Sequence, residues 1–337
     1  MSTFGMKALR ACAVLLATYC LAGAAMAQQG CKPVALPAGA QGPGLCYGKE
    51  TWQEPTLNNV WLKQNFDFYR AATSGPAPLI VWAHPSLMSK TLKPGTPMYE
   101  ALVVPALNAG FSFASIEFRH PVTNENVPNS ATDPGVPHYD VARALQFIRA
   151  NALALNIDKR NVFFVGQSRG TLTVWTALQD DMARPKSNDP VARESTRVNA
   201  VYGVQAQTTY DGIEFANLFI LPGPDDRDAF INDFKQQHPH YAQFGSAIRS
   251  VSAGADPDPP VRLIYDAPVV PKQVTYAQMQ LLDGIHYPDF GPALCKAYIV
   301  AFGNSARCSY DADVRYKDNP AAAFAGYVDF FKAYLVK

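Results

Sequence analysis

The stretch VFFVGQSRGTLTVW, Val162–Trp175, places Ser168 between Gly166 and Gly170. An apolar run typical of a buried strand precedes the serine, and a segment suited to a helix follows it. A G-x-S-x-G pattern between a strand and a helix predicts a sharp turn that exposes the serine as a nucleophile. The two glycines fit this interpretation, because such a turn brings neighbouring backbone close to it. The alternative, a structural serine in a glycine turn, is disfavoured by the flanking elements.

Strand-like and helix-like segments alternate on both sides of this turn. Apolar runs predict strands at 65–72, 78–84, 111–118, 161–165, 198–204 and 261–265. Apolar periodicity predicts helices at 98–108, beyond the Pro/Asn-rich loop 121–137, from about 171, and at the C-terminal stretch 319–335. This alternation favours an α/β fold with a mostly parallel central sheet flanked by helices. Residues 207–258 are long for a simple connection and predict a small helical cap insertion.

The N-terminus has the pattern of an export signal. Lys7 and Arg10 precede an apolar run, and Ala25-Met26-Ala27 forms a small-x-small cleavage site. The apolar run is shorter than the ~20 residues of a membrane-spanning helix, so no stable membrane anchor is expected. The sequence therefore predicts a signal peptide at 1–27, a single domain at 28–337, and an exported protein, periplasmic or extracellular.

Four cysteines remain once the predicted signal peptide is removed. An even number of cysteines in an exported chain indicates disulfides. Four cysteines allow three pairings, and we predict the sequence-local one, Cys31 with Cys46 and Cys295 with Cys308. Their spacing does not resemble a zinc site, so no metal is predicted.

The charge balance of the chain indicates which kind of partner it binds. The chain has 29 Lys and Arg residues against 28 Asp and Glu residues, and it has no basic run. It therefore lacks the electrostatic footprint of a nucleic-acid-binding protein, and a small or neutral molecule is the expected partner. No organic cofactor is implied.

A serine nucleophile needs a base, and only one of the six histidines lies late in the chain. His286, in LLDGIHYPDFG, follows the last predicted strand and fits the order serine, acid, histidine. Asp266 comes directly after the strand VRLIY, where a carboxylate can orient the imidazole. Asp283 is the rival acid, because the interval from Asp266 to His286 is short for a full helix.

From about residue 65 to 294 the chain resembles α/β-hydrolases of the carboxylesterase type, close to the feruloyl-esterase-like and hormone-sensitive-lipase-like branches. The matching segments are FDFYRAA, PLIVWAH, ASIEFRHPV, ALQFIRANALALNIDKRNVFFVGQSRG, DPDPPVRLIYD and IHYPDFG. The resemblance implies a triad in which Ser168 attacks an ester carbonyl, His286 transfers the proton and Asp266 orients His286.

Two positions depart from the pattern of those families. His84-Pro85-Ser86-Leu87 stands where they carry His-Gly-Gly-Gly, and the resemblance maps the backbone N–H donors of the oxyanion hole onto Ser86, Leu87 and Arg169. Leu87 is expected to crowd the acyl pocket and to disfavour bulky esters. Arg169 replaces a small residue; its side chain either binds a substrate carboxylate or pairs with an acid such as Glu117, and the second interpretation is favoured.

The sequence thus predicts an exported serine hydrolase that cleaves small or polymer-borne carboxylic esters through an acyl-enzyme. Two alternatives remain: a serine peptidase of the prolyl-oligopeptidase type, for whose propeller the chain is short, and a non-catalytic binding protein that keeps the fold. The identity of the ester is left open, because a fold does not define a substrate.

Overall fold

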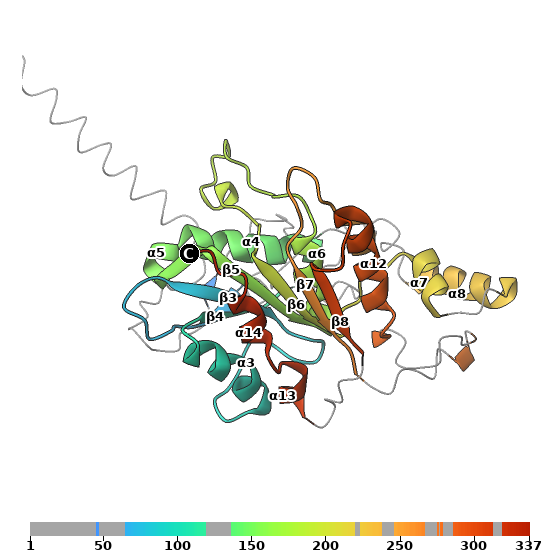
Figure 1. The fold of residues 1–337 in the computed structure, drawn as a ribbon, viewed down its shortest axis with the longest axis horizontal. Helices are drawn as coiled ribbons and strands as arrows, with labels where there is room; N and C mark the ends of the chain where they lie inside the picture. The colour runs from blue at the N-terminus through green and yellow to red at the C-terminus, as the bar shows by residue number, and fades with distance from the viewer. Residues whose placement is uncertain are drawn as a thin grey trace, which may run out of the picture.

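Eight strands form one sheet in the order β1-β2-β4-β3-β5-β6-β7-β8 (Figure 1). The computed structural model describes residues 45–46, 65–118, 136–219, 223–237, 246–266, 275, 277–278, 286–312 and 319–337. The strands are β1 (Leu45–Cys46), β2 (Asn65–Tyr69), β3 (Ala77–Ala83), β4 (Ser112–Ile116), β5 (Ile157–Gln167), β6 (Ala200–Val204), β7 (Val261–Ile264) and β8 (Cys308–Asp311). β2 is antiparallel to both β1 and β4, and the strands from β4 to β8 are parallel. The predicted mostly parallel sheet is confirmed.

Helices cover both faces of the sheet, which explains why its central strands are apolar throughout. On one face lie α4 (Val136–Ala150), α6 (Leu172–Ala177) and α12 (Phe290–Phe302), and on the other lie α3 (Pro97–Asn108), α13 (Pro320–Ala323) and α14 (Tyr327–Lys332). Phe164 of β5 packs into the first layer and its neighbour Phe163 packs into the second. Short helices at 152–155, 168–171 and 191–193 complete the connections. No helix among these described residues is long and apolar enough to cross a membrane.

The C-terminal stretch differs from the single helix that its sequence predicts. It forms α13 and α14, which are separated at Gly326, whose φ is +75°. A left-handed residue ends the hydrogen-bonding pattern of a right-handed helix. The break lets Phe324 and Tyr327 both pack on the sheet, where Phe324 contacts Trp82 at a ring-centroid distance of 5.5 Å.

The insertion at 207–258 contains helices, as its sequence predicts. The described helices are α7 (Gly212–Phe219), α8 (Pro224–Gln237) and α10 (Ala247–Ser250). The ring of Phe215 stacks on Phe230 and Phe234 with centroids 5.3 Å and 5.6 Å apart, and it lies 5.3 Å from the ring of Phe290 in α12. The aromatic residues therefore form a small core that joins α7 and α8 to α12.

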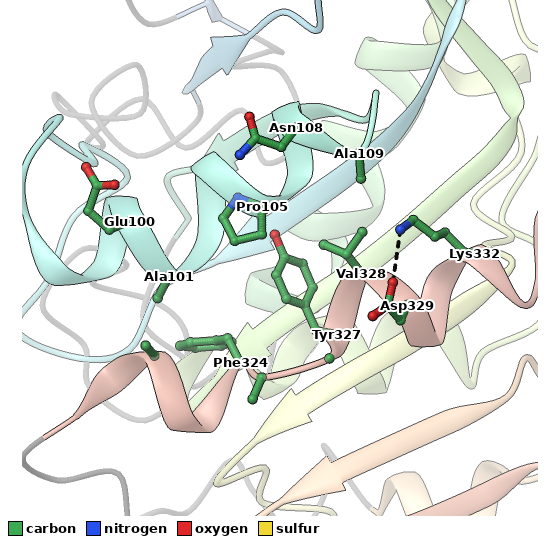
Figure 2. Close-up of a pocket in the computed structure, with 13 residues that line it drawn as sticks. Glu100, Ala101, Pro105, Asn108, Ala109, Phe324, Tyr327, Val328, Asp329 and Lys332 are labelled. Carbon is green, nitrogen blue, oxygen red and sulfur yellow. Dashed lines mark hydrogen bonds and ion pairs between the residues drawn. The ribbon is translucent and has the colours of Figure 1, made fainter.

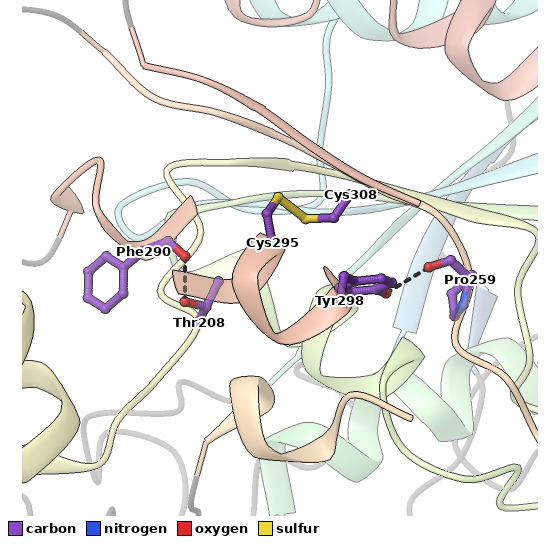
Figure 3. The surroundings of a disulfide bond; sticks show 6 residues. All are labelled: Thr208, Pro259, Phe290, Cys295, Tyr298 and Cys308. Carbon is purple, nitrogen blue, oxygen red and sulfur yellow. Dashed lines mark hydrogen bonds between the residues drawn. A yellow bond between two sulfur atoms is a disulfide. The ribbon is translucent and has the colours of Figure 1, made fainter. Parts of the chain in front are cut away.

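A disulfide joins Cys295 of α12 to Cys308 of β8, which confirms one of the two predicted pairings (Figure 3). The Thr208 hydroxyl donates to the Phe290 carbonyl at 2.9 Å, and the Tyr298 hydroxyl donates to the Pro259 carbonyl at 2.7 Å. The helix is thus held at its first residue, at Cys295 and at Tyr298. Cys31 lies outside the described residues, as do the predicted signal peptide and Asp283.

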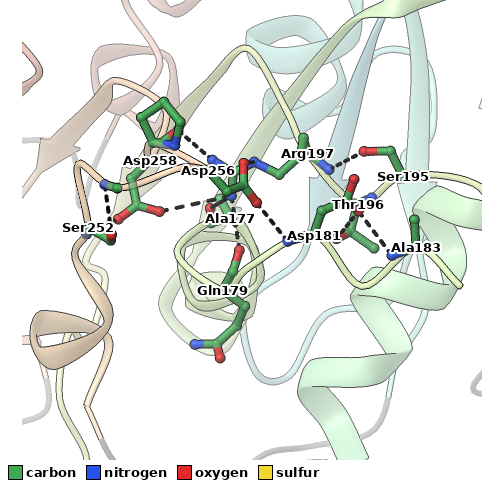
Figure 4. A network of polar contacts seen from close by, with 12 residues as sticks. Ala177, Gln179, Asp181, Ala183, Ser195, Thr196, Arg197, Ser252, Asp256 and Asp258 are labelled. Atoms are coloured by element: carbon green, nitrogen blue, oxygen red, sulfur yellow. Dashed lines mark hydrogen bonds and ion pairs between the residues drawn. The ribbon is translucent and has the colours of Figure 1, made fainter.

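Arg197 organises the amino-terminal edge of the sheet (Figure 4). Its Nε lies 2.7 Å from Oδ1 of Asp256, and its terminal nitrogens donate to the carbonyls of Ala177, Gln179 and Pro257. Nearby, Asp258 is buried and accepts a hydrogen bond from the Ser252 N–H at 2.6 Å. Burial raises the pKa of Asp258 to about 7, although the Ser252 N–H and Arg197 lower it.

Candidate active site

Ser168 occupies the sharp turn that its sequence predicts. β5 ends at Gln167, a 3₁₀ turn covers Ser168–Thr171, and α6 begins at Leu172. The φ of Ser168 is +50°, a left-handed conformation that L-residues other than glycine adopt at a cost of about 1–2 kcal/mol. Strain of this kind is typical of turns that carry a nucleophilic serine, and here the turn lies at the carboxyl edge of the sheet.

The two flanking glycines are required by close backbone approach. A Cβ on Gly166 would lie 2.0 Å from the Gly170 carbonyl oxygen, and a Cβ on Gly170 would lie 2.0 Å from the Ala83 carbonyl oxygen. Neither oxygen belongs to a side chain that could move aside. Positions 166 and 170 of this turn therefore require glycine.

His286 lies within hydrogen-bonding distance of the serine. The distance from Ser168 Oγ to His286 Nε2 is 2.7 Å. The residue comes just before α12 and between β7 and β8, so it does not follow the last strand as the sequence analysis expected. β8 was missed because its four residues, CSYD, are partly polar and three of them are not buried.

Asp266 follows β7 at the same edge of the sheet. β7 pairs with β6, and β6 pairs with β5, the strand that leads into Ser168. Parallel strands end at a common edge, so Asp266 and Ser168 are both carried there, with one strand, β6, between the strands that carry them. The rival acid Asp283 lies outside the described residues.

A buried cluster of His84, Glu117, Phe118 and Arg169 lies directly beside the nucleophile turn. His84 follows β3, Glu117 and Phe118 follow the neighbouring β4, and Arg169 follows Ser168. Arg169 Nη2 lies 3.4 Å from Glu117 Oε1, which confirms the predicted pairing. The same nitrogen donates to the Phe118 carbonyl at 3.2 Å, and the guanidinium lies 4.5 Å from the centre of the Phe118 ring.

The sequence analysis did not predict that His84 belongs to this cluster. Its Nε2 lies 3.0 Å from Glu117 Oε1 and 3.2 Å from Arg169 Nη2, and the whole residue is buried. Its Nδ1 lies 2.9 Å from the Pro85 carbonyl oxygen. The signal was available in the sequence: a histidine and a glutamate each come directly after a buried strand, and adjacent parallel strands end at one edge.

The segment after His84 makes a tight turn. The Met88 N–H donates to the Pro85 carbonyl at 3.4 Å, and Leu87, the third residue of the turn, has a φ of +65°. A turn of this kind favours glycine at that position. The Leu87 side chain is fully exposed rather than packed in the core.

A cavity of about 400 Å³ lies elsewhere, between α3 and the C-terminal helices (Figure 2). Pro105, Phe324 and Tyr327 line it, and at its rim Lys332 Nζ lies 2.9 Å from Asp329 Oδ1. None of the predicted triad residues lines this cavity. Within the described part of the chain, no group of three or more His, Cys, Asp or Glu side chains is arranged to hold a metal ion.

The mostly parallel sheet and the G-x-S-x-G turn after β5 are those of an α/β-hydrolase, and the comparisons with known proteins agree. The model of the BD-FAE family matches residues 66–277. The chain therefore belongs to the BD-FAE family, whose members are esterases of the feruloyl-esterase-like type, and the protein is a carboxylic ester hydrolase. No curated protein matches the chain.

Several solved structures share its fold. A truncated carbohydrate esterase from gut microbiota has a TM-score of 0.57 at 18% identity, with 89% of this chain and 98% of that chain covered. An acetyl ester-xyloside bifunctional hydrolase from Caldicellulosiruptor lactoaceticus has a TM-score of 0.57 at 17% identity, with 89% and 96% covered. The butyrate-bound esterase Est2 from Thermogutta terrifontis has a TM-score of 0.54 at 15% identity, with 86% and 93% covered.

Proposed function

We propose that the protein is an exported serine hydrolase that cleaves carboxylic esters through an acyl-enzyme, with Ser168, His286 and Asp266 as its catalytic triad. The observation that carries the proposal is the 2.7 Å contact between Ser168 Oγ and His286 Nε2 on a strained turn. A serine hydroxyl becomes a strong nucleophile when a base within hydrogen-bonding distance removes its proton.

In the first half-reaction, Ser168 Oγ attacks the ester carbonyl carbon while His286 Nε2 takes the hydroxyl proton. The carbonyl oxygen becomes an oxyanion, which the backbone N–H groups of Ser86, Leu87 and Arg169 bind. The intermediate then collapses, the C–O bond to the alcohol breaks, and His286 returns the proton to the leaving alcohol. Asp266 holds the imidazole in the orientation that this transfer needs.

In the second half-reaction, water replaces the alcohol. His286 takes a proton from the water, the hydroxide attacks the acyl-enzyme, and a second oxyanion forms at the same donors. Its collapse releases the carboxylic acid and returns the proton to Ser168. The cycle is balanced by one water molecule and needs no other reactant.

We infer the substrate class from the family and from the site. Short acyl esters, free or carried on a polymer such as a polysaccharide, are the proposed substrates. The neighbours named as a carbohydrate esterase and an acetyl ester-xyloside hydrolase support this class. The helices of 207–258 are proposed to act as a cap, because α7 and α8 pack through Phe215 on the helix that follows His286.

Export is part of the proposal. The predicted signal peptide at 1–27 supports it, and so does the Cys295–Cys308 disulfide, because disulfides persist mainly in oxidising compartments. N-terminal sequencing of secreted material should begin near Gln28. Secreted material that begins at Met1 contradicts a cleaved signal peptide, and protein found wholly in the cytoplasm contradicts export.

A fluorescent phosphonate probe tests the chemistry. The wild type should be labelled and should turn over p-nitrophenyl acetate and butyrate, whereas Ser168→Ala and His286→Ala should lose turnover. Labelling of Ser168→Ala as well as the wild type overturns the nucleophile assignment. Failure of the wild type to hydrolyse either ester favours a non-catalytic binding protein.

The acid is assigned by a paired comparison of Asp266→Asn and Asp283→Asn. The first should lower kcat strongly, by about 10⁴-fold if the amide holds the wrong imidazole tautomer, and the second should change it little. The reverse order transfers the role to Asp283.

A further inference from the structure

We propose that Glu117 is a positioning residue whose single buried carboxylate aligns the two chain segments that supply the oxyanion donors. This inference rests on the proposed function, in which the N–H groups of Ser86, Leu87 and Arg169 bind the oxyanion. One segment is 84–90, and the other is the residue that follows the nucleophile. The carboxylate contacts both.

The first contact set brackets the turn that carries Ser86 and Leu87. Glu117 Oε1 lies 3.0 Å from His84 Nε2, at the start of the segment, and Oε2 accepts the Lys90 N–H at 3.3 Å, at its end. The turn between them is thus held from both sides by one side chain. Its conformation needs such support, because Leu87 has a φ of +65° and a leucine adopts that value only when its surroundings hold it there.

The second contact set fixes Arg169. Its guanidinium lies 3.4 Å from Glu117 Oε1 and is buried, with the residue 6% exposed. A guanidinium stays charged at every physiological pH, so a buried one requires a nearby carboxylate. The side chain of Arg169 is thereby engaged by Glu117 and the Phe118 carbonyl, which fixes the residue that follows Ser168.

Glu117 is itself mounted on the sheet. It follows β4 directly, and its backbone N–H donates to the Asn65 carbonyl of β2 at 2.7 Å. The backbone of Glu117 is therefore fixed to the sheet. Through its carboxylate, Glu117 ties both donor segments to the sheet.

The expected kinetic effect follows from when the donors act. Oxyanion donors bind charge that develops in the transition state and not in the bound ester, so their misplacement lowers kcat and leaves KM nearly unchanged. A residue needed only for folding would instead lower the amount of active enzyme and leave the kcat per active site unchanged. Titration of active sites with the phosphonate probe separates these two effects.

The principal variant is Glu117→Gln, which keeps the shape but loses the charge that faces Arg169. With p-nitrophenyl acetate, kcat per titrated site should fall by about 10- to 100-fold, with KM within about threefold, since removing one donor outright costs about 10²–10³. The rate of phosphonate labelling should fall in parallel, because phosphonylation also builds negative charge on an oxygen. Asp189→Asn is the control. It removes the ion-pair partner of Arg143, a residue of α4, and it should leave kcat and KM unchanged.

Arg169→Lys is the second variant and decides the matter if Glu117→Gln fails to fold. It keeps the charge but loses the planar guanidinium that lies 4.5 Å from the Phe118 ring centre and whose Nη2 contacts both Glu117 and the Phe118 carbonyl. We therefore expect kcat to fall in the same direction by a smaller factor. The double variant should be no slower than Glu117→Gln alone, because both changes break one unit. A wild type without esterase activity overturns the proposed function itself. An active wild type with kcat unchanged in Glu117→Gln, or in Arg169→Lys where that variant decides, overturns the positioning role alone.

Discussion

Ser168 Oγ and His286 Nε2 lie 2.7 Å apart although 118 positions separate the two residues in the chain. Ser168 lies in the turn after β5, and His286 lies just before α12. We expect His286→Gln to lower kcat for p-nitrophenyl butyrate by about 10²–10⁴-fold, because the hydroxyl loses its base. Circular dichroism should show an unchanged fold. A variant that keeps more than a tenth of wild-type kcat contradicts the role of His286.

Gly170→Ala should destabilise the protein strongly. The added Cβ would meet the Ala83 carbonyl oxygen at 2.0 Å, and that oxygen belongs to the backbone of β3. We expect the free energy of unfolding in urea to fall by on the order of 3 kcal/mol, as for severe overpacking. Gly75→Ala is the matched control, since nothing lies within 4 Å of its Cβ, and it should change stability by less than about 1 kcal/mol. Equal effects of the two substitutions would show that the turn can relax.

The Cys295–Cys308 disulfide should stabilise the folded state by about 3 kcal/mol, the loop-entropy value for a cross-link of this length. Replacing both cysteines by serine should lower the free energy of unfolding accordingly. Because the cross-link holds the helix that follows His286, kcat should fall as well. The fraction of molecules that the phosphonate probe labels should stay unchanged. Reduction by dithiothreitol should reproduce both changes in a protein whose Cys31 and Cys46 are replaced by serine, so that Cys295–Cys308 is the disulfide being reduced.

Asp258 should make stability fall as pH rises. Its pKa is raised by burial to about 7 in the folded protein, above the ordinary value of 3.8. A raised pKa means that the folded state binds the extra proton, so the stabilisation is complete below about pH 4 and is lost as pH passes 7. Asp258→Asn removes this dependence, and its stability relative to the wild type should rise by on the order of a few kcal/mol between pH 4 and pH 8. Urea unfolding at both pH values measures the difference, and a constant offset would refute it.

The strands of the central sheet could be predicted from sequence because each is a continuous apolar run buried on both faces. The turn at Ser168 could also be predicted, because close packing requires its two glycines. A Cβ at either position would lie 2.0 Å from a backbone oxygen. β8 could not be predicted in this way. It is an edge strand with exposed residues, and the parallel partner that defines it, β7, is more than forty residues away.

The site was predictable to the extent that it depends on strand ends. Ser168, Asp266 and His84 each follow a strand, and Glu117 does so as well. The pairing of Glu117 with Arg169 was predicted, but its contact with His84 was not. That contact depends on the order of strands in the sheet, where β4 lies beside β3, and the linear sequence does not state that order. The break at Gly326 was also missed, because the apolar periodicity of 319–335 continues through it.

The position of His286 ahead of α12 has a consequence for synthesis of the chain. Every residue of the proposed triad is added to the growing chain before α12, β8 and α14 are made. The nascent chain then contains each reactive group but lacks the helix, the edge strand and the cross-link that hold the imidazole in place. Hydrolytic activity should therefore arise only when translation is complete, and nonsense variants that end anywhere after position 286 but before β8 should be inactive with an intact set of catalytic residues.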